Sequence, residues 1–479
     1  MAHAKSLLIG HEWIRTATAV PVVNPFTGEQ VAEVSQAGQA EAEAATMAAV
    51  SAFHSMRRLS SHARAHALAA LAAQLTTRQE EFAATITSES GKPVVDARRE
   101  VSRAIQTFLV AAEEAKRIPG ELLPLDWTPG TESYLGLTRR FPIGPILGIT
   151  PFNFPLNLVV HKLAPALAAG NSIVIKPAPQ TPLTALLLGE LILQTDLPPG
   201  AVSIVPCSNT VAEHMVMDSR FKLLSFTGSA AVGWMLKSKC GKKKVVLELG
   251  GNAGVIVEPD ADLDLAAQRC VTGGFAYAGQ TCISVQRIYV HAAVYDTFLG
   301  KLLAKVRTLK SGDPSDQGTV VGPVIDQGAA RRIEAWMREA VAQGARVQVG
   351  GARSGALLEP TVLTEVTPSM KVSCQELFGP LLTVMPYTRF DDALAALNNS
   401  EYGLQAGVFT QDVNKIFQAF RQLEVGAVLA NEIPTFRADH MPYGGVKESG
   451  LGREGVRYAI EDMTELKLLV LNLKDTPSA

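Results

Sequence analysis

Three side chains in the sequence could together perform covalent chemistry on a carbonyl carbon. Cys282, at the end of the run Gly-Gln-Thr-Cys, offers a sulfur nucleophile, and Glu248 offers a carboxylate that could accept a proton. Asn153 offers a side-chain amide that could donate a hydrogen bond to an oxyanion. A nucleophile, a base and an oxyanion donor are what such a reaction requires. Each residue is weak evidence alone, because a single cysteine is more often a small buried hydrophobe.

Short apolar runs just before several of these residues predict a parallel sheet that positions them. The predicted strands are Pro145–Thr150, Ser172–Ile175, Ala201–Val205, Phe221–Phe226 and Val245–Leu247, with helices at His161–Ala169 and Leu183–Leu193. Strands that alternate with helices indicate an α/β sheet, in which ligands bind at the carboxyl ends of the strands. Because Asn153, Lys176, Gly228 and Glu248 all follow strand ends, we expect them to surround one crevice.

A second alternating block follows, from about Gly251 to Lys447. Its predicted strands are Gly254–Val257, Gln286–His291, Gly407–Thr410 and Val425–Leu429, and its predicted helices are Ala329–Gln343 and Asp391–Leu397. Upstream of both blocks, the Ala-rich stretch Gln39–Arg117 predicts several amphipathic helices. With 479 residues the chain is longer than one hydrophobic core usually serves, so we expect more than one domain.

Composition and charge exclude several classes of function. The chain carries 44 Lys and Arg against 46 Asp and Glu, a net charge of -2, which gives no attraction for nucleic acid or an anionic membrane. Five irregularly spaced cysteines without a C-x-x-C pair argue against disulfides and structural zinc, and we expect no metal. No apolar run suits a signal peptide or a transmembrane helix, so the sequence predicts a cytoplasmic protein.

Two glycine-containing stretches are candidates for dinucleotide binding. Gly450–Gly455 matches G-x-G-x-x-G, but the residues before it do not form the strand that this fingerprint needs, so a Gly-rich turn is the better interpretation. The stretch Ser225–Gly233 instead follows a strand and opens a helix, whose N-terminus could bind a pyrophosphate. The residues predicted to contact the cofactor there are Thr227, Gly228, Ser229 and Gly233. The alternative is an ordinary tight turn between strand and helix.

Seven motifs, in order along the chain, together resemble the aldehyde dehydrogenase superfamily. They are Pro151–Pro155 (P-F-N-F-P), Ile175–Ala178 (I-K-P-A), Phe226–Ser229 (F-T-G-S), Glu248–Gly251 (E-L-G-G), Gly279–Cys282 (G-Q-T-C), Glu376–Pro380 (E-L-F-G-P) and Pro442–Gly450 (P-Y-G-G-V-K-x-S-G). The resemblance covers nearly the whole chain, and the order of so many motifs makes it highly specific.

The resemblance implies three structural parts. These are a Rossmann-like parallel-sheet cofactor domain from residues 1–122 and 142–250, an α/β catalytic domain from 251–447, and a small β bridging or oligomerisation element from 123–141 and 448–479. The bridging element would come from strands at Ser133–Phe141 and Glu465–Leu473, which pair across subunits in the family. The expected assembly is therefore a homodimer or a homotetramer.

The resemblance also implies a reaction. Cys282, as a thiolate, attacks the aldehyde carbon, while its backbone N–H and the side chain of Asn153 hold the oxyanion. The adduct expels hydride to the nicotinamide and leaves a thioester, which Glu248 hydrolyses by activating water. Two alternatives remain open. The first is a CoA-acylating enzyme, although such members typically lack the acid at position 248, and the second is a non-catalytic structural or binding relative.

The implied cofactor is NAD or NADP. By resemblance, Lys176 and Glu376 hold ribose hydroxyls, Phe378 packs near the nicotinamide, and Phe152 belongs to the same site. In many NAD-preferring relatives an acid occupies the position that is Pro179 here, so we expect NADP to be accepted as well. If the family resemblance were set aside, the sequence would suggest that Lys176 is a solvated lysine and Glu376 a surface acid.

The expected substrate is a short polar aldehyde such as lactaldehyde, glycolaldehyde, glyceraldehyde or a small semialdehyde such as succinate semialdehyde. Relatives that oxidise charged aldehydes place arginines around the substrate mouth, and Arg103 and Arg437 resemble two of these positions. Thr281 occupies a third, and Phe154 is a further candidate contact. Arg103 could equally be a helix-surface arginine, and we expect His161 to be a packed helix residue rather than a ligand.

Overall fold

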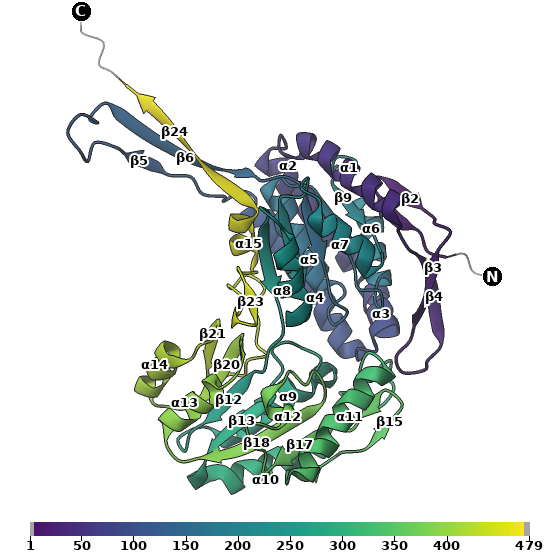
Figure 1. The fold of residues 1–479 in the computed structure, drawn as a ribbon, viewed down its shortest axis with the longest axis vertical. Coiled ribbons are helices and arrows are strands. Elements are labelled where there is room, and N and C mark those ends of the chain that lie inside the picture. Colours follow the sequence, from purple (N-terminus) through teal and green to yellow (C-terminus); the bar gives the residue numbers. More distant parts are fainter. Residues whose placement is uncertain (1–3, 474–479) are drawn as a thin grey trace, which may run out of the picture.

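A computed structural model describes residues 4–473 and contains two large sheets, each flanked by helices (Figure 1). The first sheet has eight strands, in the order β2 (Glu12–Ile14), β1 (Leu7–Ile9), β9 (Val202–Ile204), β8 (Ile173–Lys176), β7 (Ile146–Ile149), β10 (Leu223–Thr227), β11 (Lys244–Glu248) and β23 (Gly450–Leu451). The five strands from β9 to β11 are parallel, and each overlaps a strand that the sequence predicts. The predicted α/β class is therefore confirmed.

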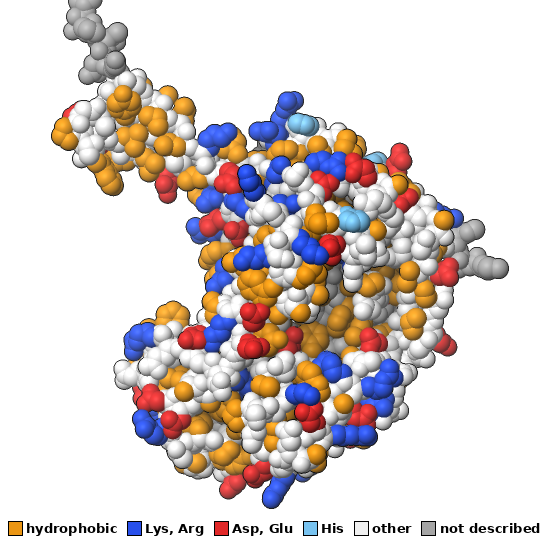
Figure 2. Space-filling model, in the orientation of Figure 1, with side chains coloured by type: hydrophobic (Ala, Val, Ile, Leu, Met, Phe, Trp, Pro, Cys, Tyr) orange, Lys and Arg blue, Asp and Glu red, His pale blue; other side chains and the backbone are white. Residues whose placement is uncertain are grey.

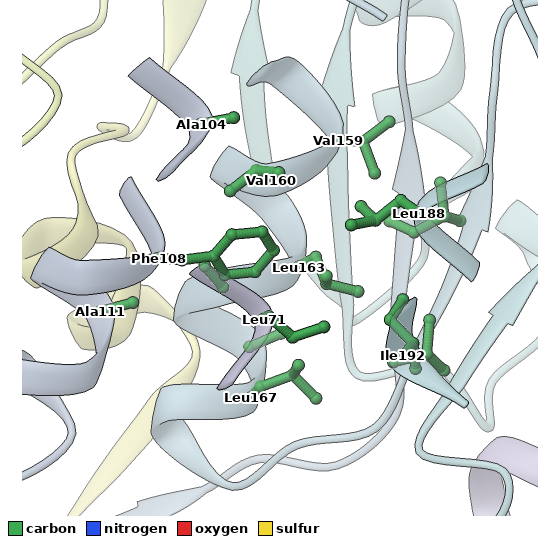
Figure 3. Packing of buried hydrophobic residues seen from close by; sticks show 14 of the residues in the cluster. Leu71, Ala104, Phe108, Ala111, Val159, Val160, Leu163, Leu167, Leu188 and Ile192 are labelled. Atoms are coloured by element: carbon green, nitrogen blue, oxygen red, sulfur yellow. The ribbon is translucent and has the colours of Figure 1, made fainter. Parts of the chain in front are cut away.

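Helices cover both faces of this sheet. The helices on one face are α1 (Gln39–Met56), α7 (Asn209–Met217) and α8 (Ala230–Lys239). Those on the other are α2 (Ser61–Thr77), α3 (Gln79–Ser90), α4 (Val94–Glu114), α5 (Asn157–Ala169) and α6 (Leu183–Ile192). Every residue of α5 is buried, which suits a helix that is mostly apolar all round. Figure 3 shows Leu71 of α2 and Phe108 of α4 beside Leu163 and Leu167 of α5.

The second sheet has seven strands. Their order is β14 (Arg346–Val349), β17 (Thr361–Thr364), β18 (Leu381–Tyr387), β13 (Arg287–His291), β12 (Gly254–Val257), β20 (Gln405–Phe409) and β21 (Ala427–Ala430). Its main helices are α9 (Leu263–Phe275), α10 (Tyr295–Val306), α11 (Gln327–Ala342), α13 (Phe390–Asn398) and α14 (Val413–Gln422). The sequence analysis missed β17 and the internal strand β18. Pro386 near the end of β18 is a residue that argues against a central strand.

Three strands form an arm that extends away from the two sheets (Figure 1). They are β5 (Leu122–Pro124), β6 (Tyr134–Pro142) and β24 (Thr464–Asn472). Within one chain, β6 and β24 pair with each other in antiparallel orientation. Pairing of these strands across subunits, which the family resemblance implied, stays a prediction. Apolar side chains cover much of the arm's surface (Figure 2), and on β24 Leu466, Leu468 and Leu469 are all exposed.

The Gly450–Gly455 stretch is not a dinucleotide fingerprint, as the sequence analysis concluded, and it contains the two-residue strand β23 and a bend. The short strand β23 pairs antiparallel with β11, whereas a dinucleotide fingerprint follows a strand of a parallel sheet. Gly452 and Gly455 have φ of 80° and 96°, in the left-handed region that glycine enters at little cost. A seven-residue helix, α15 (Val456–Asp462), follows this stretch and packs against α5. Within residues 4–473, no helix has the length and apolarity that crossing a bilayer requires.

Candidate active site

A cavity of about 620 Å³ lies where residues that follow the strand ends of the first sheet meet the loops of the second. It brings Asn153 and Glu248, two of the four residues in the strand-end argument, together with Cys282. The other predicted site residues that line it are Arg103, Phe152, Phe154, Thr227, Gly228, Ser229, Thr281, Glu376, Phe378 and Arg437. Lys176, Pro179 and Gly233 are not among the residues that line the cavity.

A strained turn carries Cys282 into the cavity. After α9 the chain forms one turn of 3-10 helix in which Tyr277 and Ala278 have φ of 49° and 52°. Side chains rarely adopt this left-handed conformation, so the surrounding contacts must hold it. The Gln280 side chain supplies one such contact, because its Oε1 accepts a hydrogen bond of 2.8 Å from the backbone N–H of Ile325. The strained backbone at Tyr277 and Ala278 therefore fixes the position of the Cys282 sulfur.

Asn153 is buried, and its side-chain nitrogen donates a hydrogen bond of 3.0 Å to the carbonyl oxygen of Gln280. This contact ties the loop after β7 to the loop that carries Cys282. An amide nitrogen has two hydrogens, so one of them remains available to an oxyanion in the cavity. The arrangement therefore suits an oxyanion donor, with Asn153 oriented by the same backbone that positions the sulfur.

The thiol of Cys282 is strongly biased towards its protonated form. Burial raises its pKa to about 12, and the carboxylates of Glu376 and Glu248 act in the same direction. Two groups act in the opposite direction, namely the hydroxyl of Tyr443, whose Oη lies 2.9 Å from Sγ, and the guanidinium of Arg437. A thiolate nucleophile at this position therefore needs those two groups, or a base, to form near neutral pH.

Glu248, at the carboxyl end of β11, is a buried acid whose two carboxyl oxygens have no hydrogen-bond partner among the described residues. Burial, together with the negative charge of Glu454, raises the pKa of Glu248 well above its usual value. Glu454 is buried too, but Lys162 at 3.3 Å and Arg437 at 2.9 Å outweigh its burial and lower its pKa to about 2. The surroundings thus move the pKa values of two neighbouring carboxyls in opposite directions, which is a common arrangement in acid–base sites.

The cofactor-side residues form a donor set that suits a dinucleotide. Ser229 occupies the N-cap position of α8 without a side-chain cap hydrogen bond, so N–H groups there stay free and, with the helix dipole, favour a phosphate. Lys176 ends β8, and burial lowers its pKa. Glu376 accepts a hydrogen bond of 3.0 Å from the N–H of Gly251, and burial raises its pKa to about 7. These groups fit the hydroxyl and phosphate groups of NAD(P).

The remaining predicted cofactor residues lie in different surroundings. The rings of Phe152 and Phe378 meet edge to face at 5.9 Å on the cavity wall. Pro179 is exposed at the surface, three residues beyond Lys176. Gly233 packs tightly inside α8, since a Cβ there would stand 2.3 Å from the side chain of Leu249. Gly233 therefore serves helix packing in this structure, rather than lining the cavity.

The two predicted substrate arginines belong to one charged network. Arg103 of α4 donates to Asp439 through Nη2 at 2.7 Å and Nε at 3.2 Å, and Arg437 donates to Glu454. His161 is buried on α5, as expected, but it also lies 2.8 Å from Asp439 and 3.4 Å from Arg437. Burial opposes the charge of Asp439, yet its hydrogen bond with His161 and the charge of Arg103 hold its pKa below the usual range.

The sequence analysis missed four residues of this site: Lys162, Asp439, Tyr443 and Glu454. Tyr443 lies in the P-Y-G-G motif, so the motif could have drawn attention to it. The other three had no local signal, since an acid or a lysine in an ordinary stretch reads as a solvated charge. Their contacts join distant segments, for example Lys162 and Glu454, and depend on burial that a sequence does not display.

Comparisons with known proteins agree with this geometry. The sequence profile of the aldehyde dehydrogenase family matches residues 13–469. A 3-sulfolactaldehyde dehydrogenase from Priestia aryabhattai is 45% identical over 98% of both chains. The crystal structure of aldehyde dehydrogenase 21 from Physcomitrella patens, in complex with the reaction product succinate, is 45% identical and has a TM-score of 0.97 over 99% of this chain and 100% of that chain.

A third similarity concerns the cofactor. The structure of the NADP-dependent glyceraldehyde-3-phosphate dehydrogenase from Bacillus halodurans, complexed with NADP, is 34% identical and has a TM-score of 0.96 over 98% of this chain and 100% of that chain. Proteins that share this much sequence identity over nearly complete chains have the same fold and the same type of reaction. The chain therefore belongs to the aldehyde dehydrogenase family and is an NAD(P)-dependent aldehyde dehydrogenase.

Proposed function

We propose that the enzyme oxidises a short aldehyde with an anionic group at its far end, such as a sulfonate or a carboxylate, to the corresponding acid. The observation that carries this proposal is that Arg103 and Arg437 are among the four arginines within residues 4–473 that line the cavity containing Cys282; the others are Arg99 and Arg332. Arg103 and Arg437 come from α4 and from the segment after β21, so the fold brings two guanidinium groups to the same cavity from distant parts of the chain.

Both arginines retain hydrogen-bond donors for a substrate. A guanidinium has five N–H groups, and Arg103 uses two of its nitrogens on Asp439. Arg437 is nearly buried and donates to Glu454 through Nη2, which leaves its Nη1 without a hydrogen-bond partner among the described residues. Guanidinium groups bind carboxylates and related oxyanions with good geometry. These contacts favour an anionic end group over a hydroxyl.

The relatives point to the same substrate class. Sulfolactaldehyde carries a sulfonate, and succinate is a product that retains a second carboxylate. Both molecules place the anion within a few bonds of the reacting carbon, which fits the size of the cavity. Among the short polar aldehydes that the sequence suggested, the anionic ones therefore receive the most support.

We propose the following roles in the reaction. The sulfur of Cys282 attacks the carbonyl carbon, and the Asn153 side chain and the Cys282 N–H stabilise the oxyanion. The chemistry that NAD(P) supplies when bound is acceptance of the hydride from that carbon, and a thioester on Cys282 remains. Glu248 in its ionised form then takes a proton from a water molecule, which attacks the thioester and releases the acid.

The cofactor would occupy the side of the cavity near the first sheet. The N-terminus of α8 after Gly228 would hold the pyrophosphate, while Lys176 and Glu376 would hold ribose hydroxyls. Phe152 and Phe378 would contact the nicotinamide. We also propose the domain division at residues 122, 142, 250 and 447, which places the cofactor side in the first domain and Cys282 in the second.

A matched substrate series tests the proposed specificity. Lactaldehyde, glyceraldehyde and 3-sulfolactaldehyde share a skeleton and differ only in the group on the last carbon, which is hydrogen, hydroxyl or sulfonate. We expect kcat/KM for the sulfonate to exceed that for glyceraldehyde by about a hundredfold, which corresponds to about 3 kcal/mol. Arg103→Gln should reduce that preference and leave glyceraldehyde turnover nearly unchanged. The control is Arg98→Gln, since Arg98 lies on the same helix but pairs with Glu80 at the surface.

Two outcomes would contradict the proposal. One is a higher kcat/KM for long-chain or aromatic aldehydes than for the anionic ones. The other is an Arg103→Gln enzyme that keeps the full preference for the sulfonate.

We further propose that the arm joins subunits into a homodimer or a homotetramer. The exposed leucines of β24 and the free edge of that strand support this, because an exposed apolar strand edge favours pairing with another chain. Light scattering of the purified protein measures the mass directly. A Leu468→Glu variant should shift it towards the monomer, and an unchanged mass for this variant would argue against assembly through β24.

A further inference from the structure

We propose that the hydroxyl of Tyr443 donates a hydrogen bond to the sulfur of Cys282 and stabilises its thiolate, so that Tyr443 sets the reactivity of the nucleophile. This role concerns the thiol itself, and it goes beyond the proposed substrate class. The contact that motivates it is the distance of 2.9 Å between Tyr443 Oη and Cys282 Sγ.

Tyr443 is held firmly in place. Its backbone N–H donates to the carbonyl oxygen of Glu454 at 3.0 Å, and the N–H of Glu454 donates back at 2.6 Å. The ring is buried and clusters with Ile283 and Leu404 beside Cys282. The guanidinium of Arg437 stacks on the other part of the ring, 3.7 Å from its centroid. The hydroxyl therefore has one well-defined position, and in that position it meets the sulfur.

The charges around the sulfur make this contact important. The titratable or charged groups that face the thiol are Tyr443, Arg437, Glu248 and Glu376. Burial and the two carboxylates disfavour a thiolate, so the groups that favour it are the tyrosine hydroxyl and the arginine. Hydrogen bonds to an ionised acceptor are about twice as strong as neutral ones, so the contact stabilises the thiolate more than the thiol.

Tyr443 also stays a donor over the working pH range. Burial and the nearby Cys282 raise the pKa of the Tyr443 phenol well above its usual value, so the hydroxyl keeps its proton while the thiol ionises. In the neutral thiol either group can donate. Once Cys282 loses its proton, the tyrosine hydroxyl is the donor that remains, and Arg437 supplies positive charge on the far side of the ring.

The test is the pH dependence of Cys282 alkylation in Tyr443→Phe, a substitution that keeps the ring and the arginine stack and removes only the hydroxyl. Iodoacetamide is added to the free full-length enzyme from about pH 6 to about pH 11, and mass spectrometry follows the Cys282 peptide. The pKa of the thiol, about 12, lies above this range, so the alkylation rates of the two enzymes are compared at each fixed pH. A pKa raised by about one unit in Tyr443→Phe should lower the rate about tenfold. Tyr295→Phe is the control, since that hydroxyl instead donates to the carbonyl of Val384 in the second sheet.

The direction of the change in alkylation rate decides the proposal. An unchanged rate in Tyr443→Phe would mean that the hydroxyl does not stabilise the thiolate, and a higher rate would mean that the thiol donates to the tyrosine instead. If Tyr443→Phe does not fold, 3-fluorotyrosine at position 443 provides a second test, because its more acidic hydroxyl should raise the rate. Neither assay uses an aldehyde or a cofactor, so the result is independent of the proposed substrate.

Discussion

The backbone of Cys282 lies directly against Gly251: a Cβ at position 251 would stand 2.0 Å from the carbonyl oxygen of Cys282. No side chain fits in that space. The N–H of Gly251 also donates to Glu376 at 3.0 Å. The second glycine of the E-L-G-G motif is therefore where the G-Q-T-C and E-L-F-G-P motifs meet, and it fixes the distance between Glu248 and the sulfur.

Gly251→Ala should displace the loop that carries Cys282. Overpacking of this kind typically costs about 1–3 kcal/mol of stability, and a displacement of about 1 Å can lower kcat about a hundredfold. Thermal unfolding and kcat with one good aldehyde measure the two effects. Gly300→Ala in α10 is the control, since its Cβ would meet no atom within 4 Å. Wild-type kcat in Gly251→Ala would show that the loop tolerates the shift.

Cys282→Ala should abolish aldehyde oxidation and leave cofactor binding intact. The substitution removes the sulfur that forms the covalent bond, while the cofactor side of the cavity keeps its residues. Fluorescence titration with NAD(P)H measures binding, and absorbance measures turnover. Cys374→Ala, at a partly exposed thiol outside the cavity, should have wild-type activity. Measurable oxidation by Cys282→Ala would contradict the proposed nucleophile.

Glu248→Gln should slow hydrolysis of the thioester much more than its formation. An amide of similar shape cannot accept the proton from water, and loss of a general base lowers a rate by about 10²–10⁴. A rapid-mixing experiment should therefore give a burst of NAD(P)H close to one per active site, followed by a slow steady rate. A variant with an unchanged steady rate would remove Glu248 from this role.

Hydrolysis of the thioester should accelerate as the pH rises through and above neutrality. Burial and the charge of Glu454 raise the pKa of Glu248 well above its usual value, so the ionised fraction that acts as the base grows over a higher pH range than for an ordinary glutamate. Glu454→Gln removes the negative charge that raises this pKa. The pH range over which the hydrolysis rate rises should therefore move to lower pH. Single-turnover hydrolysis at several pH values measures it. Glu465→Gln on the arm is the control. An unchanged pH–rate profile in Glu454→Gln would mean that Glu454 does not raise the pKa of Glu248.

Pro179→Glu should weaken the use of NADP selectively. Pro179 is exposed and carries no charge, so it does not repel a 2′-phosphate, whereas a carboxylate there would. The measurement is kcat/KM for NADP and for NAD with one aldehyde, and the NAD value in the same variant is the internal control. If the wild-type enzyme already prefers NAD by more than about a thousandfold, about 4 kcal/mol, a group other than residue 179 must exclude NADP.

The sequence predicted much of the frame that holds the site. The five parallel strands of the first sheet are short, mostly apolar and bounded by turn residues, so their positions follow from local pattern. Asn153, Lys176, Gly228 and Glu248 could be assigned to one edge of that sheet, because parallel strands place their carboxyl ends together. The internal strand β18 was missed, since Pro386 contradicts the local pattern and only neighbouring strands stabilise it.

Sequence alone therefore determined the family and the positions of the parallel strands of the first sheet, and it singled out the proposed thiol, base and amide. The tertiary structure decided their charge states and their partners. Tyr443 lies far from Cys282 along the chain, as Lys162 does from Glu454, and only the packing of buried segments brings each pair together. The raised pKa values of Glu248 and Cys282 have the same origin, because the free energy of a charge depends on burial and on neighbouring charges, which no local pattern of residues encodes.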